Sequence, residues 1–140
     1  MIAQHTTLTH RTHGNDHMID LTGDLQEAVA ATGIRTGQVA AMVTGSTAAL
    51  TTIEFEPGLV THDLAAALER IAPRDGHYEH EATWHDDNGH SHVRASLVGP
   101  SLALPVFEGK IPFGTWQHAV LVDFDTRPRD RTVHVSIVGV

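Results

Sequence analysis

The chain has 140 residues, no cysteine, and 17 acidic side chains against 9 Lys and Arg, so its formal net charge is −8 with its 12 histidines counted as neutral. This length predicts one domain, residues 1–140, that buries roughly 70% of its unfolded surface without disulfides or a structural metal. The composition excludes thiol chemistry, its acidic balance argues against nucleic-acid binding, and no apolar run of about 18 residues indicates a membrane span. We therefore expect a soluble cytoplasmic protein whose metal ligands are drawn from His, Asp and Glu.

The first half of the chain alternates between the periodicities of strands and helices. Apolar side chains recur at every second residue in the predicted strands, and Val60, Leu64 and Leu68 fall on one helix face. Gly33 is expected to end the first helix. The predicted elements are strands at residues 2–11 and 18–21, a helix at 22–31, strands at 38–44 and 48–55, and a helix capped by Thr61 and ended by Pro73.

The second half opens on a polar stretch, residues 74–91, which shows no periodicity. A loop of that length inside a compact domain is unusual unless it is functional. Apolar runs separated by Gly and Pro turn signals follow it. They predict strands at residues 92–98, 101–107, 117–124 and 132–139, which gives an α+β domain dominated by strands, with two helices and no internal repeat.

Five of the 12 histidines lie between residues 77 and 92, in the polar stretch and at the start of the strand predicted after it. On a strand, His90 and His92 share a face with their Cα atoms about 6.6 Å apart, from which two imidazoles can bind one cation. His80 is the expected third ligand, which leaves a position open for water or substrate. A solvated loop whose histidines bond to neighbouring carboxylates is the alternative.

Two further sets of polar residues are candidates for a site. Glu54 follows apolar residues at the end of a predicted strand, where a carboxylate can act as a general base or a metal ligand, although the strand alternation allows it to face solvent equally well. The tight turn after residue 44 offers hydroxyls and backbone amides to an anion. The candidate anion-binding residues are Ser46, Thr47, Arg94 and Lys110, each of which also has a purely structural explanation.

Several segments resemble the signature segments of the YjbQ-like family of small bacterial and archaeal proteins. They are Ser46–Thr51 continuing to Glu54, Tyr78–Glu81, Ser91–Leu102, Gly109–Ile111 and Gly114–Gln117. The resemblance covers nearly the whole chain. It implies an α+β fold assembled as a homotrimer, a metal-containing pocket shared between subunits, and a secondary thiamine-phosphate synthase activity. That activity joins a pyrimidine methyl diphosphate to a thiazole phosphate and releases pyrophosphate.

The resemblance also assigns roles to individual residues by matching position. It implies His80 and His92 as metal ligands, Glu54 as the acidic site residue, and Trp116 and Gln117 as residues that form the pocket. Many bacterial members carry a histidine where this chain has Gly45. We therefore expect His90 to replace that histidine as the third ligand.

These assignments predict a metal-binding enzyme whose divalent ion, zinc in a purified sample, is held by His80, His90 and His92, although a diphosphate substrate also suits magnesium. Three histidines with an open position also suit activation of water, so a metal-dependent hydrolase of a small phosphorylated metabolite, with Glu54 as general base, is a second hypothesis. A non-catalytic trimer that binds a metal or a metabolite is the third. The expected partners are copies of the same chain and a small phosphorylated metabolite, with no nucleic acid and no membrane.

Overall fold

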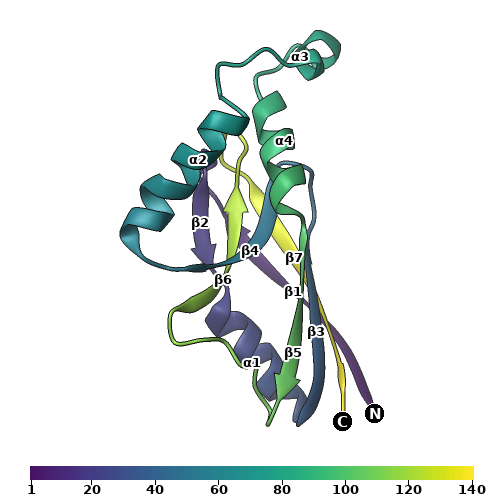
Figure 1. The fold of residues 1–140 in the computed structure, drawn as a ribbon. Helices are drawn as coiled ribbons and strands as arrows, with labels where there is room; N and C mark the ends of the chain where they lie inside the picture. Colours follow the sequence, from purple (N-terminus) through teal and green to yellow (C-terminus); the bar gives the residue numbers. More distant parts are fainter.

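All 140 residues are described by a computed structural model, in which seven strands form two antiparallel sheets (Figure 1). The elements are β1 (Ile2–Arg11), β2 (His17–Asp20), α1 (Thr22–Thr32), β3 (Thr36–Val43), β4 (Ala48–Glu54), the π-helical turn η1 (Leu59–Asp63) that continues as α2 (Leu64–Ile71), α3 (Glu79–Trp84), α4 (Gly89–Val98), β5 (Ser101–Phe107), β6 (Gln117–Asp123) and β7 (Asp130–Gly139). The α+β class is therefore confirmed. Every predicted strand except residues 92–98 is present, within two residues of its expected bounds.

The two sheets have the strand orders β1-β7-β3-β5 and β2-β6-β4, and all neighbouring pairs are antiparallel. Strand β7 shows how alternation assigns the faces of the larger sheet. Val133, Val135 and Ile137 are buried, whereas Ser136 and Val138 point outward and are exposed. The larger sheet therefore has one apolar inner face and one uncovered outer face.

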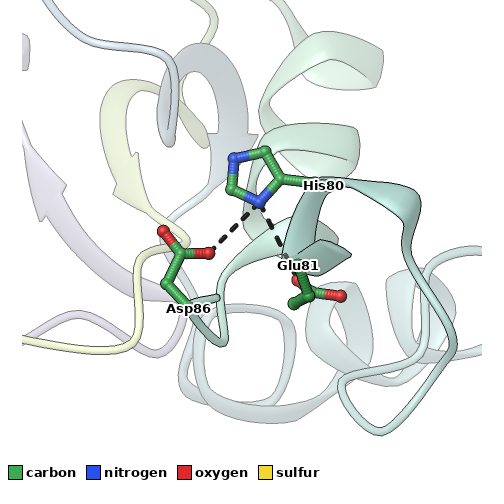
Figure 2. Close-up of side chains that lie close together, drawn as sticks. All are labelled: His80, Glu81 and Asp86. Atoms are coloured by element: carbon green, nitrogen blue, oxygen red, sulfur yellow. Dashed lines mark ion pairs between the residues drawn. The ribbon is translucent and has the colours of Figure 1, made fainter. Parts of the chain in front are cut away.

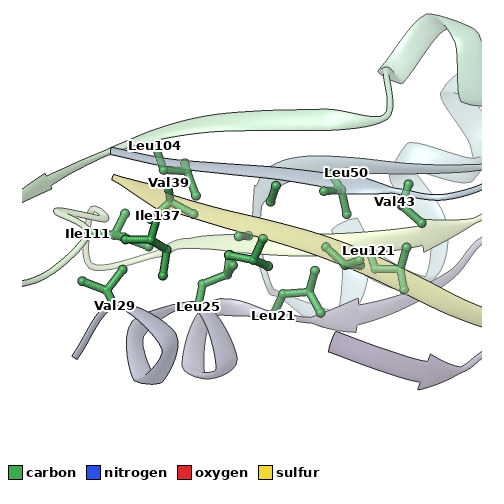
Figure 3. Close-up of a cluster of buried hydrophobic side chains, with 14 of the residues drawn as sticks. Leu21, Leu25, Val29, Val39, Val43, Leu50, Leu104, Ile111, Leu121 and Ile137 are labelled. Carbon is green, nitrogen blue, oxygen red and sulfur yellow. The ribbon is translucent and has the colours of Figure 1, made fainter. Parts of the chain in front are cut away.

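The main hydrophobic core fills the space between the two sheets and is closed by α1 (Figure 3). Leu25 and Val29, one helical turn apart on α1, are fully buried in it. Gly33 ends α1 as predicted, in the left-handed conformation at φ 73°. A smaller core on the other face of the β2-β6-β4 sheet includes Leu68 of α2 and Ala95 of α4, so these two helices are packed on that sheet.

The segment predicted as a strand at residues 92–98 belongs instead to helix α4, and the polar stretch before it contains α3. The prediction of two helices was therefore wrong, since the chain has four α-helices. The buried residues of α4 are Gly89, His90, Ser91, Arg94 and Ala95. Most of this buried face is polar, so a search for periodic apolar residues overlooks it. No helix of the protein has both the length and the apolar character needed to cross a membrane.

Arg94 explains why a polar face can be buried on α4. Its side chain is 1% exposed, and its guanidinium donates to both carboxylate oxygens of Asp16, at 3.1 and 3.2 Å, and to the carboxylate of Glu69. Its Nε donates to the carbonyl of Ala72 at 3.0 Å. Because these bonds satisfy the buried charge, Arg94 joins α4 to α2 and to the β1–β2 turn.

Candidate metal centre

Helix α3 lies at one end of the molecule, beyond the ends of the sheets, and is followed by α4, which runs back along the β2-β6-β4 sheet (Figure 1). Helix α3 carries His80 and ends at His85, which is left-handed at φ 54°. The chain then turns back through residues 86–88 into α4, which carries His92. The imidazole rings of His80 and His92 therefore come together, with their centroids 4.4 Å apart and their planes inclined at 41°.

Two carboxylates accompany this histidine pair, and we call the set of His80, Glu81, Asp86 and His92 the His80 cluster. Nδ1 of His80 lies 3.2 Å from Oδ1 of Asp86 and 3.9 Å from Oε1 of Glu81 (Figure 2). The donor atoms of these three residues all lie within 4.8 Å of one another. Although Nδ1 of His80 is buried and close to Asp86, it makes no hydrogen bond. A bound cation would satisfy this orphaned nitrogen.

The surroundings of His92 favour the neutral form that a metal ligand needs. Burial and the neighbouring His80 lower the pKa of His92, and they outweigh the opposing effects of Asp125, Asp86 and a hydrogen bond to the backbone of Ser46. A neutral imidazole binds a metal without first losing a proton. Imidazole and carboxylate oxygen together are a donor set that zinc accepts, so the residues of the His80 cluster fit a divalent ion.

His90 does not join this cluster, because the strand on which its predicted role depended is a helix. Residues two apart on a helix point about 200° away from each other, whereas on a strand they share a face. The His90 side chain is turned inward, 1% exposed, with its ring centroid 6.3 Å from that of Tyr78 and its Nδ1 without a partner. Burial, followed by the charge of Arg94, lowers the pKa of His90. The expected three-histidine set is thus replaced by two histidines and two carboxylates.

Glu54, Trp116 and Gln117 lie together, but at the other end of the β4–β6 ladder. The register pairs Glu54 with Gln117 at one end of the two strands and Ala48 with Asp123 at the other. Six residues of strand correspond to about 20 Å, so within one chain these residues are far from the His80 cluster. Glu54 is exposed, and Trp116 is 71% exposed.

Of the four predicted anion-binding residues, only Ser46 lies beside the His80 cluster with a polar side-chain group that makes no bond within the chain. Thr47 is buried, and its hydroxyl donates to Asp125 at 2.9 Å. The donors of Arg94 are already bonded to two carboxylates and a carbonyl. Lys110 comes after the last residue of β5, whereas α4 comes just before the first residue of that strand, so Lys110 is separated from α4 by the length of β5. The predicted anion site is therefore dispersed rather than assembled.

A buried charged network beside the His80 cluster was missed by the sequence reasoning. Asp123 and Asp125, at the end of β6, are almost fully buried and pair with Arg131 and Arg129 respectively. The side-chain amide of Asn88 connects this network to the cluster, since its two polar atoms lie 3.4 Å from Asp125 and 3.0 Å from Asp86. The sequence did contain a signal for this network. An apolar run leads directly into the two aspartates, which indicates that they are buried, and three arginines that could neutralise them follow at residues 127, 129 and 131.

Asp125 is expected to make the free energy of unfolding decrease as the pH is lowered into the acid range. Burial alone would raise the pKa of Asp125, but hydrogen bonds from the N–H of Thr126 and the hydroxyl of Thr47, together with the charge of Arg129, lower it below its ordinary value. Because its pKa is lower in the folded chain, this carboxylate stabilises the fold above the pKa of the unfolded chain, about 4, and that contribution is lost as pH falls through the folded pKa.

We expect Asp125→Asn to unfold more easily than the wild type at neutral pH, and to lose less additional stability when the pH is lowered to about 3. Urea unfolding at both pH values measures the two differences. Equal losses of stability on acidification in the wild type and the variant would contradict the expectation.

The fold and the His80 cluster together define a small two-sheet α+β protein with a candidate metal centre at one end. The family model described as UPF0047 protein YjbQ-like matches residues 6–140 of the chain. The chain belongs to this family, as the resemblance of its motifs predicted.

Relatives and solved structures of this family are similar over nearly the whole chain. A UPF0047 protein of Methanothermobacter thermautotrophicus is 36% identical over 129 residues, covering 92% of this chain and 87% of the relative. The UPF0047 protein YugU of Bacillus subtilis is 31% identical over 134 residues, covering 95% and 98% of the two chains. A YjbQ/UPF0047-family structure from Clostridium acetobutylicum has 33% identity and a TM-score of 0.85, covering 95% of this chain and 99% of that chain.

Proposed function

We propose that this protein is a metal-dependent transferase that joins a pyrimidine methyl diphosphate to a thiazole phosphate with release of pyrophosphate, as the family resemblance implies. The observation that carries the proposal is the His80 cluster, with its orphaned Nδ1 and its two adjacent imidazoles. His80, His92 and Asp86 would hold the ion, for which zinc is the best match. When bound, a divalent ion supplies positive charge that stabilises the departing pyrophosphate.

The remaining residue of the cluster, Glu81, positions these ligands. Oε1 of Glu81 accepts the N–H of Gly89 at 2.6 Å, which fixes the first turn of α4 relative to α3. The helix register in turn orients His92 toward His80. Glu81 is therefore both a candidate ligand and the residue that holds the two histidine-bearing helices together.

The activity of purified protein with the two thiamine precursors tests the proposed reaction. We expect the metal-loaded wild type to form thiamine phosphate and pyrophosphate, His92→Ala to lose the activity, and Glu54→Gln to lose about 100-fold or more, in the range of a lost general base. Chromatography of thiamine phosphate and an enzymatic pyrophosphate assay measure the two products. Turnover that survives both substitutions would contradict the site assignment.

A metal-dependent hydrolase is the second candidate, and the composition of the His80 cluster favours it. Two histidines and a carboxylate around an open position are the ligand set of several catalytic zinc sites that activate water. Hydrolysis of the diphosphate substrate without the thiazole phosphate would support this candidate. No turnover of any phosphorylated substrate by the metal-loaded wild type would favour a binding protein.

We also propose that the chain assembles as a homotrimer, through the outer face of the β1-β7-β3-β5 sheet. No helix covers this face, and apart from the Arg11–Asp130 pair at one end it carries no charged side chain. Its exposed residues include Met42 and Phe107, which are 47% and 60% exposed. Depletion of charge is a property of interface cores, so this face is suited to burial against further copies of the chain. A pocket shared between subunits would also account for the distance between Glu54 and the His80 cluster.

Light scattering measures the assembly. We expect a mass about three times the 15.1 kDa of the monomer, and a fall toward the monomer mass in Ala40→Glu, which places a charge on the exposed centre of this face. Ala67→Glu, on the exposed surface of α2, is the matched control and should leave the mass unchanged. A wild-type mass of 15.1 kDa would exclude the trimer.

A further inference from the structure

One nitrogen of the Arg131 guanidinium has no hydrogen-bond partner. Arg131 lies at the start of β7, and its side chain is 7% exposed. Nε and Nη2 donate to the two carboxylate oxygens of Asp123, at 2.7 and 2.9 Å, and Nη2 also donates to the hydroxyl of Thr47 at 2.6 Å. Nη1 donates to nothing. A guanidinium that is more than nine-tenths buried, with one nitrogen unused, retains donors for an external acceptor.

The unused Nη1 lies beside Gly45, in the space that a side chain at this position would occupy. A Cβ on Gly45 would be 2.6 Å from Nη1, well inside van der Waals contact, so the absence of a side chain is what admits the guanidinium. Gly45 also has a φ of 116°, which other residues rarely adopt.

The surroundings of Gly45 provide further polar groups next to the His80 cluster. Gly45 and Ser46 are exposed and line a cavity of about 150 Å³, together with Ser96 of α4. The Ser46 hydroxyl makes no hydrogen bond within the chain, whereas the Ser96 hydroxyl donates to the carbonyl of His92. The backbone of Ser46 lies close enough to His92 to affect the pKa of that imidazole. The free guanidinium nitrogen and the free hydroxyl therefore lie at one short turn, beside the helix that carries His92.

We propose that Arg131 Nη1 and the Ser46 hydroxyl bind one phosphate group at Gly45, adjacent to the metal centre. Both are donors, and arginine binds phosphate oxygens through charge-assisted hydrogen bonds. The carboxylates that face this arginine are Asp123, which is paired with it, and Asp125, whose oxygen is 3.8 Å from Nη2 and which also pairs with Arg129. The local charge is thus balanced, and the anion is attracted by directed donors rather than by net positive charge. That this phosphate belongs to a substrate rests on the proposed function, but its binding does not.

Calorimetric titration with inorganic phosphate at constant ionic strength tests the proposal, on the protein as purified and after removal of metal by a chelator. We expect saturable binding of about one phosphate per chain in both samples. In Gly45→Ala the new Cβ displaces Nη1, so binding should weaken at least about tenfold, and Ser46→Ala should weaken it as well. Gly99→Ala is the matched control, because Gly99 has a similar φ of 95° but no atom within 4 Å of its Cβ position. It should bind phosphate like the wild type.

Circular dichroism of each variant confirms that it is folded before binding is compared. Equal phosphate affinity in Gly45→Ala and the wild type, or no saturable binding by the wild type, would overturn the proposal. Binding that disappears when the metal is removed would also overturn it, because the phosphate would then be held by the ion alone. Phosphate binding by a protein that holds no metal and turns over neither thiamine precursor would leave this site standing and refute the proposed function.

Discussion

Replacing Asp123 by asparagine is expected to lower the free energy of unfolding by about 3 kcal/mol, because it leaves the buried charge of Arg131 without its partner. Asp123 is 0% exposed and accepts bonds from Nε and Nη2 of Arg131 and from the hydroxyl of Thr12, the last at 2.6 Å. Asparagine has nearly the same shape but no charge, so the loss reports electrostatics rather than a cavity. For a chain of this length the melting temperature should fall by about 10 °C.

Asp130→Asn is the matched control for this substitution. Asp130 lies on the same strand as Arg131 and pairs with Arg11 at 3.3 Å, but both side chains are more than half exposed. An exposed ion pair contributes about 0.5 kcal/mol or less. Thermal unfolding of the two variants side by side should therefore separate them clearly. Similar melting temperatures for Asp123→Asn and Asp130→Asn would show that the buried pair contributes little.

Replacing His80 or His92 by alanine is expected to abolish stable metal binding. The two rings approach each other from α3 and α4. If either imidazole is removed, no carboxylate of the cluster occupies the same position to take its place as a ligand. We expect the affinity for zinc to fall by more than about 100-fold in either variant, beyond the range seen when supporting residues around a metal site are changed. Titration against a zinc-binding dye measures the affinity.

His90→Ala distinguishes the geometry of the structure from the prediction made on the sequence. His90 is buried next to Tyr78 and does not face the His80–His92 pair, so this variant should be less stable but bind zinc with nearly the wild-type affinity. Loss of zinc binding in His90→Ala equal to that in His92→Ala, in protein that remains folded, would restore the three-histidine set.

The strands were predictable because each has one face in a core and one in water. In β7, Val133, Val135 and Ile137 alternate with polar residues, and this alternation is visible in the sequence. Gly33 likewise identified the end of α1, because a left-handed residue is needed there. Strand alternation and helix ends depend on residues that are close together in the chain, so they can be predicted from the sequence alone.

Helix α4 was not predictable in the same way, because its buried face depends on partners that are remote in sequence. Arg94 is buried only because Asp16 and Glu69 meet it, and these residues come from the β1–β2 turn and from α2. Without that knowledge a buried arginine reads as a surface residue. The wrong assignment of this segment as a strand also caused the wrong prediction of the metal ligands, because on a strand the side chains of His90 and His92 would lie on the same face.

The candidate site was predicted in part. The clustering of histidines between residues 77 and 92 located His80 and His92, and both lie in the cluster. Asp86 was not identified, because its position depends on the turn between α3 and α4. Arg131 was not among the predicted site residues, although Asp123 holds it inside the protein beside the cluster. Spacing along the chain indicates which residues can meet, but tertiary packing decides which ones do.

The metal content of the wild-type protein, purified without chelator, tests the central claim most directly. Elemental analysis should find about one equivalent of zinc or a similar divalent ion per chain, as expected when a buried imidazole nitrogen without a hydrogen bond lies among histidine and carboxylate donors. Less than about one tenth of an equivalent, in protein that also fails to take up added zinc, would contradict the assignment of the His80 cluster as a metal centre.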